Sequence, residues 1–110
     1  MDIADQAYDL SVRLAEIVRY LKEDGQTFPL GDKLLESGIA AGLSAREGCW
    51  PTCAREVAQA DYILEMAVRS GYLTTRQSLP VRTQCAELLA ALPHENKSGP
   101  KQAQSSPSGL

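Results

Sequence analysis

The stretch that decides the fold runs from Leu30 to Cys49, LGDKLLESGIAAGLSAREGC. Its apolar and small residues recur every three or four positions, the spacing that aligns side chains along an α-helix. Read as a helix, it has two adjacent stripes: Leu30, Leu34, Gly38, Ala41, Ala45 and Gly48; then Leu35, Ile39, Gly42 and Leu43. The polar residues share the remaining circumference: Lys33, Glu36, Ser37, Ser44 and Glu47. A surface helix usually has one narrow apolar face, so we expect this helix to be the most enclosed element of an all-helical domain.

Two glycines lie inside this predicted helix. A glycine in a helix interior costs about 1 kcal/mol relative to alanine, so Gly38 and Gly42 make sense where another backbone comes close. We therefore predict a close helix–helix contact at Gly38, Gly42 and Ala45.

Three further helices are predicted around this one. The first runs from about Ala4 to Asp24, with Gly25 as its stop, and the third from Pro51 to Ser70. Thr75 or Ser78 could cap the fourth, which ends at Pro93. We prefer Ser78, because Thr75 as the cap would place Pro80 where a proline breaks an internal hydrogen bond.

The connections between these helices are short, so consecutive helices must run antiparallel. Phe28 and the pair Tyr72–Leu73 are expected to fold over one end of the helices. We predict an all-α protein, an antiparallel up-down four-helix bundle formed by residues 1–92. Residues 93–110 are rich in proline, serine and glycine with one large apolar residue, Leu110, and we expect them to form a disordered tail.

The first predicted helix carries a second stripe, Tyr8, Val12, Ala15 and Arg19, well away from its core stripe. Scattered surface apolar residues need no explanation, so one interpretation is an ordinary half-exposed side. The other is a contact surface for a second subunit. On the third helix, the pair Tyr62 and Met66 lies opposite the core stripe, on a side that we expect to be mostly solvated.

Composition limits the classes of function. The 110 residues are 44% hydrophobic but only 5% aromatic, which indicates one domain with an aliphatic core. The net charge of −3 disfavours a protein that mainly grips phosphate backbones. No apolar run approaches the roughly 20 residues of a membrane span, and the acidic N-terminus has no apolar signal region. We expect a cytoplasmic protein without a membrane partner.

No set of residues points to a metal, a cofactor or a catalytic reaction. Cys49, Cys53 and Cys85 with His94, the only histidine, lack the spacing of a zinc site. Four carboxylates could converge inside the bundle as in di-iron proteins: Glu36, Glu47, Glu56 and Asp61. Those proteins use Glu-x-x-His pairs, and this sequence has none. We therefore predict reduced thiols, solvated carboxylates, no cofactor and no enzymatic activity.

The basic residues are spread along the chain among acidic ones. The nearest approach to a nucleic-acid footprint, which would be a dense basic stripe, is Arg13, Arg19 and Lys22, with Glu16 and Glu23 among them. We favour a solvated face over nucleic-acid contact.

Three segments of the chain resemble a known family. SVRLAEIVRYLKEDG (11–25), FPLGDKLLESGIAAGLSAREG (28–48) and ILEMAVRSGYL (63–73) are similar to the bacterial four-helix-bundle proteins that include the intervening-sequence proteins of ribosomal RNA genes. A more distant similarity is to the accessory protein of diversity-generating retroelements. The resemblance implies an up-down bundle that assembles into a ring, with a pentamer favoured. The retroelement proteins are basic whereas this chain is acidic, which disfavours nucleic acid as a partner.

The sequence thus predicts a non-catalytic scaffold or interaction protein that forms a homo-oligomer, with a further protein partner compatible with that role. The alternative is a nucleic-acid-binding accessory protein that acts with a reverse transcriptase or with ribosomal RNA.

Overall fold

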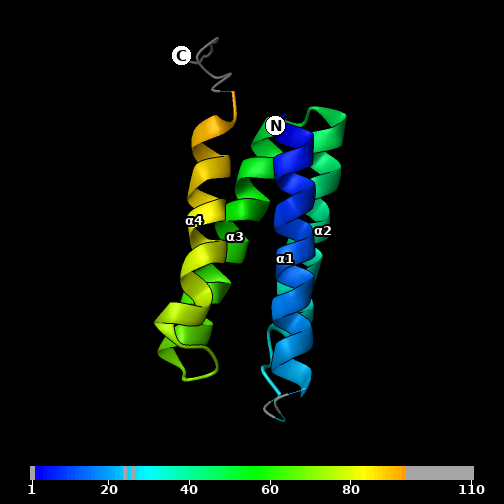
Figure 1. The fold of residues 1–110 in the computed structure, drawn as a ribbon. Coiled ribbons are helices and arrows are strands. Elements are labelled where there is room, and N and C mark those ends of the chain that lie inside the picture. The colour runs from blue at the N-terminus through cyan, green and yellow to red at the C-terminus, as the bar shows by residue number, and fades with distance from the viewer. Residues whose placement is uncertain (1, 24, 26, 94–110) are drawn as a thin grey trace, which may run out of the picture.

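The computed structural model describes residues 2–23, 25 and 27–93. Within them lie four helices: α1 (Ile3–Glu23), α2 (Gly31–Glu47), α3 (Trp50–Arg69) and α4 (Thr75–Ala91). Each helix packs against the next in the chain, and α4 also packs against α1, so α1 and α3 stand diagonally across the bundle. Short connections reverse the chain direction each time (Figure 1). The predicted antiparallel up-down four-helix bundle is confirmed. The predicted disordered tail lies outside the described residues except for Pro93.

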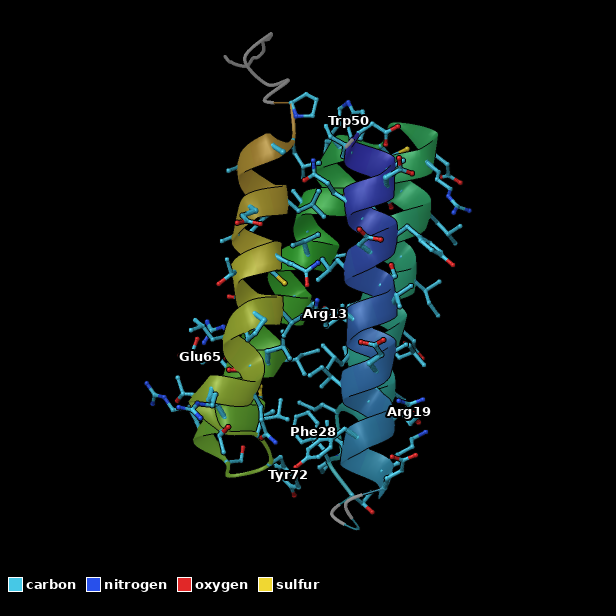
Figure 2. The ribbon with its side chains drawn as sticks, viewed as in Figure 1. Arg13, Arg19, Phe28, Trp50, Glu65 and Tyr72 are labelled. Carbon is cyan, nitrogen blue, oxygen red and sulfur yellow. The ribbon has the colours of Figure 1, made fainter. Side chains whose placement is uncertain are left out.

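The interior is aliphatic, as expected from the scarcity of aromatic residues. The largest fully buried apolar side chains come from all four helices: Leu10, Leu14, Leu34, Val57, Leu64, Val81 and Leu88. Phe28, from the α1–α2 connection, is buried at one end of the bundle, with its ring centroid 4.9 Å from that of Tyr72 (Figure 2). Leu73, which follows Tyr72, is also buried and belongs to the hydrophobic core.

Three glycines that follow helices have a positive φ, among them Gly25, the predicted stop of the first helix, with a φ of +79°. Gly48 follows α2 with a φ of +74°, which lets the amide of Cys49 donate to the carbonyl of Ser44 at 2.9 Å. Gly71 follows α3 with a φ of +88°, and the amide of Tyr72 then donates to the carbonyl of Ala67 at 2.8 Å. These bonds pair carbonyls that the helix ends would otherwise leave open, and they direct Tyr72 and Leu73 back toward the bundle.

The prediction that Ser78 caps the fourth helix is wrong. Helix α4 begins at Thr75, and Thr74 is its cap: the Thr74 hydroxyl accepts from the amide of Gln77 at 3.0 Å, while the Gln77 side chain accepts from the amide of Thr74 at 2.8 Å. This reciprocal capping box stabilises a start ahead of Pro80. Proline still removes the bond to the carbonyl of Arg76, but both residues are exposed, so water can pair with that carbonyl.

The expectation that α2 is enclosed over both apolar stripes is also wrong. Ile39 and Leu43, from its second stripe, are half-exposed, whereas Ser37 and Ser44, expected among the outward polar residues, are buried. The reason is that, in the part of the chain that the structure describes, α2 packs closely on two helices, α1 and α3. Ser37 lies on the side toward α3, where its hydroxyl accepts from the side-chain amide of Gln59 at 2.6 Å. The bundle therefore buries these two small serines and leaves the larger Ile39 and Leu43 on its surface.

Candidate functional site

The contact between α1 and α2 is built on glycine. A Cβ on Gly42 would lie 2.9 Å from the hydroxyl oxygen of Ser11, and a Cβ on Gly38 would lie 3.0 Å from the Cδ1 of Leu14 and 3.6 Å from the Cα of Ser11. The Ser11 hydroxyl donates to the carbonyl of Gly38 at 2.6 Å, and the carbonyl of Ala7 lies 3.0 Å from the same oxygen. Ala45, the third predicted packing residue, is buried in the core. The two backbones therefore approach closely along this line.

Exposed apolar side chains lie along the outward side of this contact. On α1, Tyr8 and Val12 both lie on the side of Ser11 that faces away from the buried Leu14. On α2, Ile39 and Leu43 directly follow the two glycines. Their exposed fractions are 54%, 41%, 50% and 53% in that order. With the exposed Ala15 and the half-buried Leu35 they form what we call the outer face: Tyr8, Val12, Ala15, Leu35, Ile39 and Leu43.

The outer face joins two helices into one surface. The guanidinium carbon of Arg46, from α2, lies 5.4 Å from the ring centroid of Tyr8, from α1, a cation–π distance. The stripe predicted on α1 supplied only half of this face. The α2 half was missed because Ile39 and Leu43 were assigned to a neighbour inside the bundle. The sequence did carry a signal for their exposure. Ile39 and Leu43 each follow a glycine that contacts α1, and the residue after such a contact points partly outward.

Arg19, the fourth residue of the predicted stripe, lies farther along α1. Its side chain is 73% exposed, with its Nε 3.9 Å from Glu23. An exposed pair at that distance contributes little to stability, so Arg19 remains available to a partner at the edge of the outer face.

The three basic residues proposed for nucleic-acid contact do not form one surface. Figure 2 shows Arg13 and Arg19 on opposite sides of α1. Lys22 lies toward α2, where its ammonium is 3.5 Å from Asp32. A phosphate backbone could meet only part of this set at a time.

The carboxylates considered for a di-iron site do not converge. Glu36 and Glu47 are exposed on α2. The Glu56 carboxylate accepts from Gln59 at 3.4 Å, and Asp61 forms a two-point pair with Arg82 at 2.8 and 3.2 Å. Within residues 2–23, 25 and 27–93, no three His, Cys, Asp or Glu side chains are grouped closely enough to hold a metal ion.

The pair between Asp61 and Arg82 instead joins α3 to α4. A second carboxylate, Glu65, lies 3.6 Å from the same guanidinium. The hydrogen bond to Asp61 raises the pKa of Arg82 above its ordinary value, and the two negative charges add to this effect. Asp61, Glu65 and Arg82 therefore hold α3 and α4 together.

The cysteines differ in their surroundings. Cys49 is exposed, whereas Cys53 and Cys85 are buried, and His94 lies outside the described residues. Burial raises the pKa of Cys53 and raises that of Cys85 to about 12, because a thiolate loses its hydration there. Both buried thiols therefore stay protonated in the folded protein.

We expect Cys49 alone to react with iodoacetamide in the folded protein at mildly alkaline pH, and all three cysteines to react in denaturant. Mass spectrometry of tryptic peptides measures this directly. Folding raises the pKa of Cys85 from 9.0 to about 12, so the unfolded chain loses this proton at lower pH than the folded protein. The resulting contribution to the free energy of unfolding is fully present below pH 9.0 and is lost as the pH rises toward about 12. Rapid labelling of Cys85 without denaturant would contradict its burial.

No helix among the described residues has the length and apolar character needed to cross a membrane.

Comparisons with known proteins agree with this fold. No family model matches the chain, and no curated protein matches it either. Among solved structures, the chain is similar to a Bacteroides thetaiotaomicron protein of unknown function from the S23 ribosomal protein family, the family of the intervening-sequence proteins. The TM-score is 0.78 with 20% sequence identity, over 83% of this chain and 94% of that protein. The chain thus shares the four-helix fold of an intervening-sequence-family protein.

Proposed function

We propose that this protein is a member of the intervening-sequence family and acts as a non-catalytic, self-associating interaction protein. The observation that carries the proposal is the outer face. Scattered surface apolar residues are ordinary, whereas large apolar side chains gathered on one surface mark interaction sites. Here Tyr8, Val12, Ile39 and Leu43 lie together over the α1–α2 contact.

The outer face suits a subunit contact for two further reasons. It lies on helices locked together by the glycine contact, so its shape is set before a partner arrives, which lowers the ordering cost of association. Its centre is apolar and includes Tyr8, a residue type enriched at interfaces. Under this proposal the protein forms a homo-oligomer, for which the family resemblance favours five copies.

Nucleic-acid binding is not proposed, because the separation of Arg13, Arg19 and Lys22 offers no basic stripe. Any binding to RNA or DNA through these residues is expected to be weak and to fall steeply as salt rises.

Val12→Glu tests the proposal. The substitution would bury an unpaired carboxylate in the subunit contact, which is costly, while the monomer loses little because Val12 is 41% exposed. Light scattering coupled to size exclusion should show the parent as a multiple of 11.9 kDa and the variant as a smaller species with an unchanged helical circular dichroism spectrum.

A matched pair controls for the added charge. Ala15→Glu, on the outer face, should dissociate the oligomer as Val12→Glu does. Ala90→Glu makes the same change at an exposed position of α4 and should leave the parent mass unaltered. A monomeric parent, or an oligomer that keeps its mass in both outer-face variants, would refute the proposal.

A further inference from the structure

Helix α4 contributes less to the apolar interior than its neighbours do. Its buried residues are Ser78, Val81, Cys85 and Leu88, so only two of them are branched aliphatic chains. Helix α1 instead buries three leucines and a valine, and α3 buries a valine, an isoleucine and a leucine. Because burial of apolar surface is the main stabilising contribution to packing, α4 is the least firmly packed of the four helices.

The contact between α4 and α1 contains polar groups. A hollow of about 360 Å³ is lined by Gln6 and Asp9 of α1 and by Gln84 and Glu87 of α4. The side-chain oxygen Oε1 of Gln84 is buried, and no described residue donates a hydrogen bond to it. A buried acceptor without a donor destabilises the packed arrangement, and this cost disappears when α4 moves away and the oxygen meets water.

The polar links of α4 to its neighbours lie where water can replace them. Toward α1, the Gln77 side chain donates to the Tyr20 hydroxyl at 3.0 Å, and both residues are exposed. Toward α3, the side chains of Arg82 and Asp61 are 33% and 34% exposed. Ion pairs that solvent reaches contribute less than buried packing does, so these links hold α4 in place without locking it.

The contacts among α1, α2 and α3 are more tightly built. The Ser11 hydroxyl of α1 donates to the carbonyl of Gly38 in α2 at 2.6 Å, beside the close approach at Gly42. The fully buried Ser37 of α2 accepts from Gln59 of α3 at 2.6 Å. These three helices therefore form a unit to which α4 is joined more weakly.

We infer that α4 is a lid: it detaches as a unit while α1, α2 and α3 stay folded. Detachment uncovers the sides of α1 and α3 on which α4 packs. Leu73 is buried at the end of the bundle, so α4 and its Thr74–Gln77 capping box turn about the chain after Leu73. The lid is a property of one chain and does not depend on the proposed self-association.

Native-state hydrogen exchange on the full chain tests the inference. An isolated helix of this length is marginal in water, so the amide hydrogens of α4 exchange when it detaches. Amides 83–88, in the interior of α4, should share one opening free energy that falls with denaturant, the behaviour of a cooperative unit. They should exchange at least tenfold faster than the slowest amides of α2. Equal rates in the two helices would overturn the inference.

Ala41→Gly separates the lid from opening of the whole bundle. Ala41 is buried in α2, and glycine there should speed the slowest α2 amides about fivefold, the equivalent of the helix-propensity difference of about 1 kcal/mol. The exchange of amides 83–88 should not change, because the unit that opens there leaves α2 folded. If both segments speed up by the same factor, the bundle opens only as a whole and α4 is not a lid.

Gln84→Met tests the cause of the weak contact. Methionine has a similar length but no carbonyl oxygen to leave without a partner, so amides 83–88 should exchange about tenfold more slowly. Arg76→Met introduces the same residue at an exposed position of α4 and should leave their exchange within about twofold of the parent. Unchanged or faster exchange in Gln84→Met would contradict the inference.

Discussion

Gly42→Leu is expected to lower the free energy of unfolding by about 3 kcal/mol, the upper range for overpacking in a well-packed contact. The first added carbon alone would lie 2.9 Å from the Ser11 hydroxyl oxygen, and that hydroxyl is held by the carbonyl of Gly38 at 2.6 Å. The gain of about 1 kcal/mol in helix propensity does not offset the separation of α1 from α2. Denaturant titration followed by circular dichroism measures the change.

Lys33→Leu is the matched control, because Lys33 is exposed on α2 and the change should stay within about 0.5 kcal/mol. Ser37, which the sequence places among the outward polar residues, cannot serve, since it is buried against Gln59. A smaller test uses Gly42→Ala with and without Ser11→Ala. The alanine at 42 should destabilise only while the serine oxygen is present. A Gly42→Leu variant as stable as its parent would rule out the close contact.

Phe28→Ala is expected to destabilise the protein by about 3 kcal/mol, the lower range for removing a buried phenylalanine. Phe28 is only 7% exposed, and its ring packs at 4.9 Å on that of Tyr72. The alanine would leave a void where the α1–α2 connection closes on the residues that follow α3. The midpoint of chemical unfolding should shift while the slope stays the same.

Tyr72→Phe keeps the ring contact and should change stability by less than about 0.5 kcal/mol. Tyr8→Ala removes an aromatic ring of similar size from an exposed position and should have a small effect on the unfolding of the separated monomer. If Phe28→Ala unfolds at the same denaturant concentration as the parent, the end of the bundle is not closed by this ring.

The sequence by itself determined the architecture of this protein. Apolar residues at helical spacing locate the helices, and the short connections force consecutive helices to run antiparallel. These signals are local, because they depend on backbone conformation and on which side of one helix is apolar. Gly38 and Gly42 could be recognised as unusual for the same reason, since a glycine inside a helix has a local cost.

Only the tertiary structure decided which surfaces remain free. Periodicity shows that α2 has two apolar stripes, but not how many neighbours cover them, and Ile39 and Leu43 are half-exposed because α2 packs closely on two helices. The start of α4 was missed for a different reason, because the Thr74–Gln77 capping box is a local signal that the sequence carries; only the bond from the Gln77 side chain to the Tyr20 hydroxyl at 3.0 Å, across to α1, required the tertiary structure. The burial of each side depends on neighbours distant in the chain, so the outer face became visible only when α1 and α2 were placed side by side.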